Sequence, residues 1–312
     1  HPSNQALRPL LHFTGHQQTI RSVAWSPDGE FLASGGDDAQ VIVWTPDGLP
    51  HASIEHQAAV QTLAWSPEGS RLMSGSAHLV RFFTALTGNQ LATHQHAGQV
   101  NSVAWSTHGH LLAVSASDDK RAIVWQTEEY LQQIVFTGHT AAILATTFSA
   151  DGRTIASSSL GGVVRVWTAA TGAELHPLYQ DTLLPIPALA FAPSRTDLAT
   201  GSTDGVMRLW NAFQCQAVRT SDQGPLCTDA PLRFQQTHGA IRTLAWSPDG
   251  RYLASGSDDG ALALWDLVQS KTPVLSVLIQ LYAAIHSIAW SPDSTSLVTA
   301  AGTTATIWHL DA

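Results

Sequence analysis

Apolar and polar residues alternate along most of this chain in short runs that are separated by turn-forming residues. Two such runs are Val41-Ile-Val-Trp44 and Val163-Val-Arg-Val-Trp167, and clusters of Pro, Asp and Gly recur between the runs at short intervals. Alternation with a period of two is typical of β-strands with one buried face. Because no segment keeps a helical period over several turns, the pattern predicts an all-β protein.

One phrase of this pattern returns along the chain. Residues 20–29 read Ile-Arg-Ser-Val-Ala-Trp-Ser-Pro-Asp-Gly, residues 241–250 read Ile-Arg-Thr-Leu-Ala-Trp-Ser-Pro-Asp-Gly, and weaker copies lie between them. Each copy has two aromatic positions 18 to 20 residues apart, and successive copies are 40 to 44 residues apart, with one spacing of 55. Seven repeats of this length predict a seven-bladed β-propeller made of four-stranded antiparallel blades. The first aromatic column is Trp25, Trp65, Trp105, Phe148, Phe191, Trp246 and Trp290, and the second is Trp44, Phe83, Trp125, Trp167, Trp210, Trp265 and Trp308.

The repeats resemble a known family. Gly15-His16 and Gly138-His139 open two of them and Trp265-Asp266 ends another, which is the pattern of the WD-repeat (WD40-repeat) family, and the Ser-Pro-Asp-Gly turns look like those of its bacterial members. The resemblance implies a ring closed by strand exchange, with residues 7–13 as the outermost strand of the last blade. It implies one domain over residues 1–312, with blades at about 14–56, 57–96, 97–138, 139–181, 182–237, 238–281 and 282–312 plus 7–13.

His, Ser and Asp recur together with the second-column tryptophan. One such set could pass for the triad of a hydrolase, but a catalyst needs a single triad and an oxyanion hole, and no signal for the latter is visible. The resemblance implies instead that the sets are buried hydrogen-bonded tetrads that fix blade geometry. Blades 2, 4 and 7 have Ala77, Gly161 and Gly302 in place of the acid, and blade 5 has no clear His. The three complete sets are His16, Ser34, Asp38, Trp44; His96, Ser115, Asp119, Trp125; and His238, Ser255, Asp259, Trp265.

The resemblance also implies where a partner binds, namely on the rim around the central channel, at the end that carries the loops before each first strand. In blades 4 and 5 these positions are apolar, which predicts an arc that binds a protein; the alternative is that these side chains cover the channel mouth or fill in for missing tetrads. The charged rim residues either orient an incoming peptide or pair with one another across adjacent blades. The predicted rim is Thr19, Arg21, Asp37, Gln61, Gln99, Asn101, Asp118, Leu144, Leu160, Pro187, Thr203, Arg242, Asp258 and His286.

Composition and charge narrow the class of partner. Charged residues make up 12% of the chain and the formal net charge is −9, which disfavours a general nucleic-acid binder because such proteins need clustered Lys and Arg. No run of about 18 apolar residues predicts a membrane span, and no signal peptide is visible. We therefore expect a monomeric cytoplasmic protein that binds neither nucleic acid nor membranes, although a chain that starts at His1 leaves room for an upstream segment.

The histidines predict no metal site, and no cofactor is expected. The pairs His94 with His96 and His108 with His110 have the spacing that places two side chains on one face of a strand. Zinc needs three or four converging ligands, and no Cys, Asp or Glu completes either pair. A phosphate-binding glycine loop is also absent from the sequence.

The interval between blades 5 and 6, residues 211–237, is the longest and least regular of the chain. It holds both cysteines, Cys215 and Cys227, which we expect to be free thiols, with a local disulfide as the alternative. We expect this excursion at the side of the propeller, and either a functional loop or a decoration without a role fits the sequence.

These features favour a non-catalytic scaffold that binds a protein or peptide at the rim, as the interaction domain of a larger signalling or regulatory protein. The alternative is a propeller enzyme or a small-molecule sensor that uses the central channel. That alternative requires acids or histidines that converge in the channel, whereas the innermost strands read Ser-Val-Ala-Trp and Thr-Leu-Ala-Trp.

Overall fold

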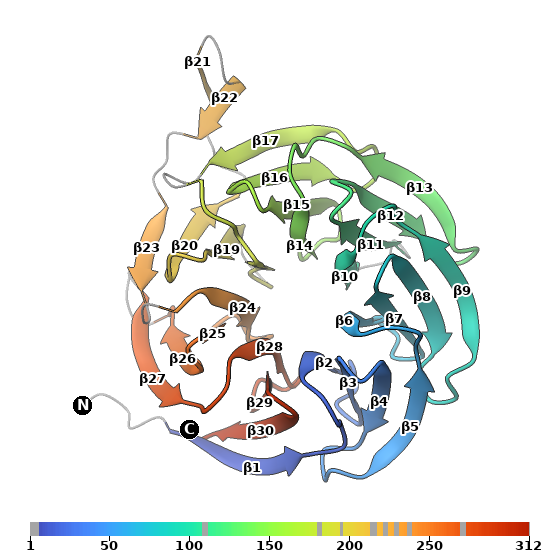
Figure 1. The fold of residues 1–312 in the computed structure, drawn as a ribbon. Helices are drawn as coiled ribbons and strands as arrows, with labels where there is room; N and C mark the ends of the chain where they lie inside the picture. The colour runs from blue at the N-terminus through green and yellow to red at the C-terminus, as the bar shows by residue number, and fades with distance from the viewer. Residues whose placement is uncertain are drawn as a thin grey trace.

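The chain folds into a ring of seven four-stranded antiparallel sheets (Figure 1). The computed structural model describes residues 6–107, 112–179, 183–193, 196–212, 217–220, 224–227, 231–235, 239–268 and 273–311. In each blade the first strand lies nearest the ring axis and the last lies on the perimeter. The predicted seven-bladed, all-β propeller is therefore confirmed.

The blades follow the chain in order. Blades 1 to 4 are β2 (Ile20–Trp25), β3 (Leu32–Gly36), β4 (Gln40–Trp44), β5 (Pro50–Glu55); β6 (Val60–Trp65), β7 (Arg71–Ser76), β8 (Leu79–Thr84), β9 (Gln90–Gln95); β10 (Val100–Trp105), β11 (Leu112–Ser117), β12 (Ala122–Gln126), β13 (Leu131–Phe136); and β14 (Ile143–Phe148), β15 (Thr154–Ser159), β16 (Val163–Thr168), β17 (Glu174–Tyr179). Blades 5 to 7 are β18 (Ala188–Phe191), β19 (Asp197–Gly201), β20 (Val206–Asn211), β23 (Leu232–Gln235); β24 (Ile241–Trp246), β25 (Tyr252–Ser257), β26 (Ala261–Asp266), β27 (Val274–Gln280); and β28 (Ile285–Trp290), β29 (Ser296–Ala301), β30 (Thr304–Leu310), β1 (Leu7–Phe13).

The ring closes by the strand exchange expected from the resemblance. β1 pairs antiparallel with β30, so that Leu7 lies opposite Leu310 and Phe13 opposite Ala305. Pro9 is tolerated because β1 is the perimeter strand of blade 7, where one row of backbone groups has no strand partner. The first and last parts of the chain are thereby held in one sheet.

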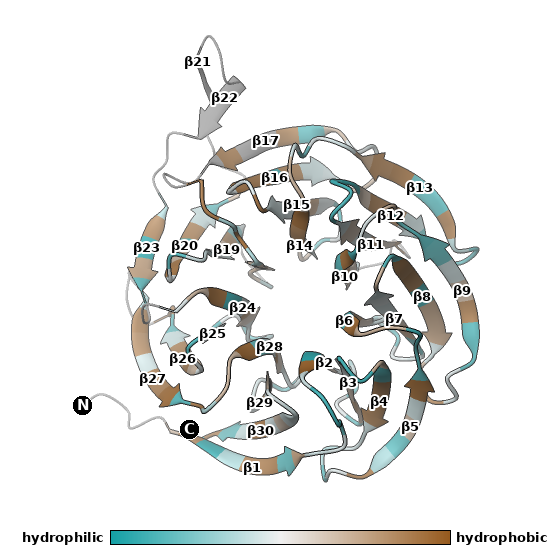
Figure 2. Ribbon diagram, viewed as in Figure 1, coloured by the Kyte–Doolittle hydropathy of each residue, from teal (hydrophilic) through white to brown (hydrophobic). Residues whose placement is uncertain are grey.

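The core lies between the blades. Apolar residues of one sheet pack on the next, and Figure 2 shows brown, apolar segments along the strands around the ring. The second-column aromatics are buried, and two of them stack on a phenylalanine from the perimeter strand of the preceding blade. Phe13 lies 4.3 Å from Trp44 and Phe136 lies 4.6 Å from Trp167, centroid to centroid. The repeated aromatic positions therefore join one blade to the next.

Two kinds of loop alternate between the two ends of the ring. On one end, here called the rim face, lie the loops that lead from one blade to the next and those that join second and third strands. The other end, the hairpin face, carries the Ser-Pro-Asp-Gly turns. In the first of these, Ser26 Oγ donates to Asp28 Oδ1 at 2.5 Å, and Gly29 has a φ of 75°. Because a positive φ of this size is strained for residues with a Cβ, glycine is suited to this position of the turn.

The long excursion between β20 and β23 contains a hairpin, β21 (Ala217–Thr220) paired with β22 (Gly224–Cys227). It projects from the perimeter of the ring beside β17 (Figure 1). This is the side position that we expected for it. Cys215 and the side chain of Cys227 lie outside the described residues, so whether they are free thiols stays a prediction.

Candidate functional site

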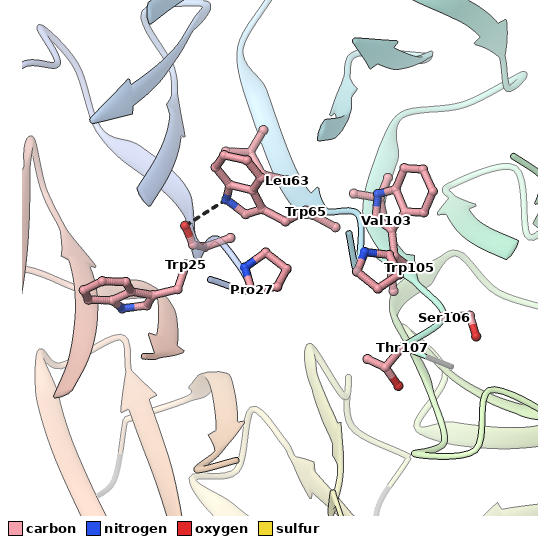
Figure 3. A pocket seen from close by; sticks show the side chains of 12 residues that line it. Trp25, Pro27, Leu63, Trp65, Val103, Trp105, Ser106 and Thr107 are labelled. Carbon is pink, nitrogen blue, oxygen red and sulfur yellow. Dashed lines mark hydrogen bonds between the residues drawn. The ribbon is translucent and has the colours of Figure 1, made fainter. Parts of the chain in front are cut away.

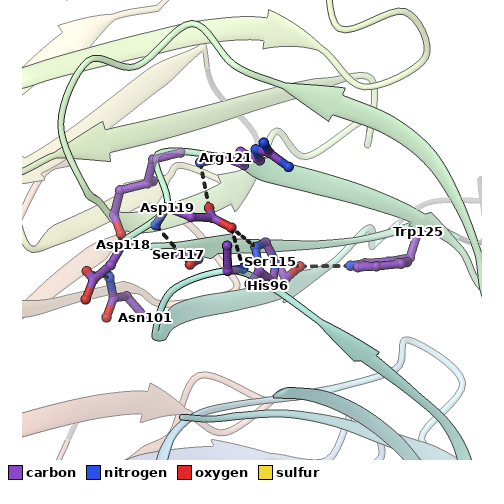
Figure 4. A network of polar contacts seen from close by, with 10 residues as sticks. His96, Asn101, Ser115, Ser117, Asp118, Asp119, Arg121 and Trp125 are labelled. Carbon is purple, nitrogen blue, oxygen red and sulfur yellow. Dashed lines mark hydrogen bonds and ion pairs between the residues drawn. The ribbon is translucent and has the colours of Figure 1, made fainter. Parts of the chain in front are cut away.

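The tetrad of blade 3 is a buried hydrogen-bonded network (Figure 4). His96 precedes β10 and places Nδ1 3.2 Å from Asp119 Oδ2 and Nε2 2.8 Å from Ser115 Oγ. The Trp125 Nε1–H donates to the same Ser115 oxygen at 2.8 Å. Blade 1 repeats the arrangement, with His16 Nδ1 2.9 Å from Asp38 Oδ2, His16 Nε2 2.8 Å from Ser34 Oγ, and Trp44 Nε1 3.2 Å from Ser34 Oγ.

The ionisation of this network is fixed by burial and hydrogen bonds. Burial lowers the pKa of His96, and the charge of Asp119 only partly opposes this. Burial alone would raise the pKa of Asp119, but N–H groups of Ala97 and Arg121, together with His96, hold it below the ordinary value. A neutral imidazole therefore donates Nδ1–H to a carboxylate, which leaves Nε2 to accept the serine proton.

The same relay in a hydrolase would activate the serine, but here the serine cannot reach a substrate. Ser34 and Ser115 are completely buried, and each oxygen also accepts an indole N–H. A nucleophile must contact its substrate, and these two oxygens lie inside the blades. The geometry supports the structural interpretation of these sets.

Blade 6 shows part of its predicted tetrad. Trp265 Nε1 donates to Ser255 Oγ at 3.0 Å. The carboxylate of Asp259, in the loop after β25, accepts a hydrogen bond from Ser257 Oγ at the end of that strand. His238 lies outside the described residues, so its place in this tetrad stays a prediction.

Two blades without the acid still contain the histidine. His139 Nε2 lies 2.8 Å from Ser157 Oγ in blade 4, and His56 Nε2 lies 2.8 Å from Ser74 Oγ in blade 2. Burial, and then the charge of Arg81, lowers the pKa of His56 to about 4, and burial with Arg165 lowers that of His139 to about 3. His56 was missed in the sequence, although its spacing of 18 residues to Ser74 equals that of His16 to Ser34 and of His139 to Ser157.

In blade 5, where the sequence shows no clear tetrad histidine, an arginine is buried beside the tetrad acid. Arg208 on β20 is 2% exposed, and its guanidinium lies 3.0 Å from Asp204, the acid in the tetrad position. Arg208 pairs in the sheet with Thr200, as Arg81 pairs with Ser74 and Arg165 with Ser157. Arginine thus occupies this third-strand position in blades 2, 4 and 5, whereas blades 1, 3 and 6 have Ile42, Ile123 and Ala263 there.

The charged residues predicted for the rim pair within single blades. Arg21 donates through Nε and Nη2 to both oxygens of Asp37, at 2.8 and 2.6 Å. Arg242 does the same to Asp258, at 2.5 and 2.8 Å. The pairing across adjacent blades that we considered is therefore wrong for these two pairs, because each arginine lies beside the acid that follows the second strand of its own blade.

In blade 3 an amide replaces the guanidinium. Asn101 Nδ2 lies beside Asp118 (Figure 4) and donates to its Oδ1 at 2.7 Å. It also donates to the Ile143 carbonyl at 2.8 Å. The second bond crosses from blade 3 to blade 4. Asn101 therefore both holds the rim acid and joins neighbouring blades.

The predicted apolar arc is present and larger than expected. Leu160 is 52% exposed, and Leu183 and Leu184, which precede β18, are 79% and 41% exposed. A backbone hydrogen bond from Ile186 N–H to the Ser159 carbonyl joins the loop before blade 5 to blade 4, and one from Leu160 N–H to the Ala142 carbonyl joins two loops of blade 4. Sequence reasoning missed Leu183 and Leu184 because it considered fixed positions relative to the aromatic columns, and the loop lies between them. We call Leu144, Leu160, Leu183, Leu184 and Pro187 the apolar arc.

The other predicted rim residues also reach the surface. Backbone bonds tie several of them to the loops of the same blade, as in Asp37 N–H to the Thr19 carbonyl and Asp118 N–H to the Gln99 carbonyl, both 2.9 Å. Partly or fully exposed side chains of the predicted set include Thr19, Gln61, Gln99, Leu144, Pro187, Thr203 and His286. The rim face therefore offers an apolar sector at blades 4 and 5 and a charged sector at blades 6, 7 and 1.

The hairpin face has a pocket of about 460 Å³ near the ring axis, between blades 1, 2 and 3 (Figure 3). Its walls include Trp25, Trp65 and Trp105, and Trp65 Nε1 donates to the Ala24 carbonyl at 3.2 Å. Every residue that lines it is uncharged and none is a histidine. Acid–base chemistry of the kind that the enzyme alternative requires has no titratable group in this pocket.

In the part of the chain that the structure describes, no group of three or more His, Cys, Asp and Glu side chains converges as metal ligands would. His94 stacks on Trp125 instead, with centroids 4.2 Å apart, while His108 and His110 lie outside the described residues. The same ranges contain no helix long and apolar enough to cross a bilayer.

Comparison with known proteins identifies the repeat. The family model described as "WD domain, G-beta repeat" matches residues 7–45, 49–84, 88–126, 131–168, 181–211, 230–266 and 276–309. A solved structure of the RRP9 WD40 repeats superimposes with a TM-score of 0.84 at 20% identity, covering 98% of this chain and all of that one. At this identity the superposition shows the shared fold.

Curated relatives match over shorter stretches. WD repeat-containing protein VIP3 of Arabidopsis thaliana is 29% identical over half of either chain, and the small ribosomal subunit protein RACK1z of the same plant is 28% identical over 42% of this chain and 41% of its own. The chain spans half or less of the length of such relatives, down to 21% for periodic tryptophan protein 2. Relatives from plants, fungi, Dictyostelium and human lend no support to the expected bacterial type.

Proposed function

Because the chain belongs to the WD-repeat family, we propose that it is a non-catalytic scaffold that binds a protein or peptide partner at its rim face. Several relatives bear names that place them in assemblies, such as the small ribosomal subunit protein RACK1z. A ring of sheets that presents loops at its ends is suited to this role, since loops on a fixed framework carry recognition.

The observation that carries the proposal is the apolar arc. Leu160, Leu183 and Leu184 together expose apolar side chains at the meeting point of two blades, where burial would stabilise the fold more than exposure does. Contiguous exposed apolar surface rimmed by polar groups is typical of protein-binding sites. In blade 5 Trp210 Nε1 donates to Thr200 Oγ1 at 3.1 Å and Arg208 lies 3.0 Å from Asp204, so these leucines are not needed to fill in for a missing tetrad there.

The absence of catalysis is part of the proposal. The serines that resemble nucleophiles are buried, and the hairpin-face pocket is lined by uncharged residues. We further propose a monomeric, cytoplasmic domain that binds neither nucleic acid nor membranes, and that serves within a larger signalling or regulatory protein. The net charge of −9 supports the first exclusion, because phosphate backbones repel an acidic surface.

A capture experiment tests the proposal. Immobilised wild-type protein is compared with a Leu160→Asp, Leu183→Asp variant in a lysate of the source organism, with RNase-treated lysate in parallel. The matched control is Leu131→Asp on β13, since Leu131 is 57% exposed on the perimeter, away from the rim. We expect a protein that wild type and control retain with or without RNase and that the rim variant loses. Retention by the rim variant would place the binding site elsewhere.

A further inference from the structure

Three basic side chains stand side by side on the rim face. Arg242, His286 and Arg21 are each the second residue of an innermost strand, in β24, β28 and β2 of three successive blades. Hydrogen bonds hold these strands in step, from Ile288 N–H to Thr243 Oγ1 at 3.2 Å and from Val23 N–H to Ser287 Oγ at 3.1 Å. The three side chains therefore lie at the same level around the ring axis.

The two arginines are held by aspartates, yet each guanidinium keeps N–H donors that are not hydrogen-bonded to any described residue. Each contacts its aspartate through Nε and Nη2, the side-on geometry of a bidentate pair. Among the described residues, neither Nη1 has a hydrogen-bond partner, so the Nη1–Nη2 edge of each guanidinium retains N–H donors. Because Arg21 and Arg242 are partly exposed, at 34% and 45% of their side chains, an incoming acceptor can reach them.

The cluster is close enough for its charges to repel one another. The positive charge of Arg21 lowers the pKa of Arg242, but the hydrogen bond to Asp258 has the larger effect, and the pKa of Arg242 is raised overall. Burial first, and then both arginines, lower the pKa of His286, while Asp258 and Asp37 act in the opposite direction. A negative group placed among the three side chains would relieve this repulsion.

We propose that Arg21, His286 and Arg242 form a site for the anionic oxygens of an acidic segment of the protein partner, either side-chain carboxylates or a phosphate group on a side chain. The proposal rests on the proposed function and adds the chemistry of the partner. Guanidinium groups held by aspartates bind such oxygens with little loss of side-chain freedom. The acidic segment lies over blades 6, 7 and 1, and the apolar arc is left for apolar residues of the same partner.

The geometry favours an acidic over a basic ligand. Both oxygens of Asp37 and of Asp258 already accept hydrogen bonds from their arginines, so a lysine or arginine of a partner would have to displace an existing pair. An acidic group uses donors that are free. Blade 3 shows the contrast, because Asn101 holds Asp118 with a neutral amide and adds no positive charge there.

Short synthetic peptides test the site directly. The probes are a peptide of consecutive glutamates, the same peptide with one phosphoserine, and a glutamine peptide of equal length, each titrated calorimetrically into the full chain. The test variant is Arg21→Gln with Arg242→Gln. The control is Arg8→Gln with Arg153→Gln, which removes the same charge from two exposed side chains away from this cluster.

We expect one or both acidic peptides to bind wild type and control at least tenfold more tightly than the test variant, and the glutamine peptide not to bind. Binding by both acidic peptides identifies carboxylates as sufficient, and binding by the phosphopeptide alone identifies a phosphorylated partner. A second variant, Asp37→Asn with Asp258→Asn, keeps the arginines and should bind the acidic peptides more tightly. NMR should also show the His286 pKa rising in the bound state.

Equal binding of the glutamine peptide, undiminished binding by the arginine variant, or no binding of either acidic peptide would overturn the proposal. Because the probes carry no apolar side chain, such a failure leaves the capture experiment with the leucine variant unaffected. If the leucine variant fails to capture the partner but still binds the acidic peptides, the apolar arc and the Arg21–His286–Arg242 site act as two separate binding sites on the rim.

Discussion

Phe13 of the N-terminal strand stacks on Trp44 of blade 1, with ring centroids 4.3 Å apart and planes 3° from parallel. Since β1 is the perimeter strand of blade 7, this contact fastens the closing strand to the first blade. Phe136 and Trp167 make the same contact between blades 3 and 4, where no chain end is involved. The pair shows that ring closure reuses the joint that connects ordinary neighbouring blades.

Phe13→Ala should destabilise the protein by about 3–5 kcal/mol, the usual cost of removing a buried phenylalanine. It should also speed amide exchange in residues 7–13, because the closing strand loses its anchor. Phe136→Ala is the control, with a similar loss in urea unfolding but unchanged exchange in β1. A loss below about 1 kcal/mol for Phe13→Ala would mean that backbone pairing with β30 closes the ring unaided.

The tetrads predict a graded response to loss of the serine. Ser115→Ala leaves His96 Nε2 and Trp125 Nε1 without a partner in a buried site, and each orphaned group costs about 1–3 kcal/mol. Ser74→Ala orphans only His56 Nε2, because Phe83 occupies the tryptophan position of blade 2. Urea unfolding should show that the first variant loses about twice as much free energy as the second. Equal losses would show that the indole bond contributes little.

Acid should destabilise the protein through His56 and His139. Their folded pKa values, about 4 and about 3, lie below the unfolded value of about 6.5, so the folded state resists protonation. The stability due to the neutral imidazoles is complete above about pH 6.5 and falls with decreasing pH, by about 2 kcal/mol per histidine at pH 5. Urea unfolding at pH 7 and pH 5 measures this loss.

Removing either histidine should flatten the pH dependence. His139→Gln lowers the stability at pH 7 but reduces the further loss between pH 7 and pH 5 by about 2 kcal/mol. His51→Gln, on an exposed strand, is the control and should leave the pH dependence as in wild type. If His139→Gln shows the wild-type pH dependence, His139 is not a source of the acid sensitivity.

Alanine substitutions at two neighbouring glycines test how closely the loop after β15 approaches the backbone of Leu183. Gly162 has a φ of 76°, and a Cβ there would lie 2.8 Å from the backbone of Leu183. Gly162→Ala should therefore cost more than the usual 1 kcal/mol or so of a left-handed alanine, and should displace the loop that carries Leu183. At Gly161 an added Cβ meets the Ala141 Cβ at 3.4 Å. Gly161→Ala should change thermal stability little, and equal melting temperatures for the two variants would contradict the contact.

The fold was predictable because every propeller blade repeats the same local sequence pattern. Alternating strands and two aromatic positions recur seven times, and Ser-Pro-Asp-Gly or a variant of it follows the first aromatic position in most repeats, so the sequence shows the architecture without any long-range information. The same regularity identified the tetrads of blades 1 and 3, whose members lie at nearly the same offsets in both repeats. It could not identify Arg208, because an arginine on a strand does not by itself indicate that its side chain is buried beside an acid.

The candidate site was predicted less completely than the fold. Rim residues at fixed offsets, such as Leu160 and Arg21, were found, whereas Leu183 and Leu184 lie in a loop of irregular length. The partners of Arg21 and Arg242 also depend on side-chain direction. A strand pattern places residues on a face but does not decide between an acid of the same blade and one of the next.

The most direct test of the account is amide hydrogen exchange of the full chain with and without the captured partner. Binding at the rim face should protect residues 142–144, 159–163 and 183–187, with little change in the hairpin-face turns at 26–31 and 66–71. Protection confined to the hairpin face, around the pocket of Trp25, Trp65 and Trp105, would contradict the central claim and move the binding site to the opposite end of the ring.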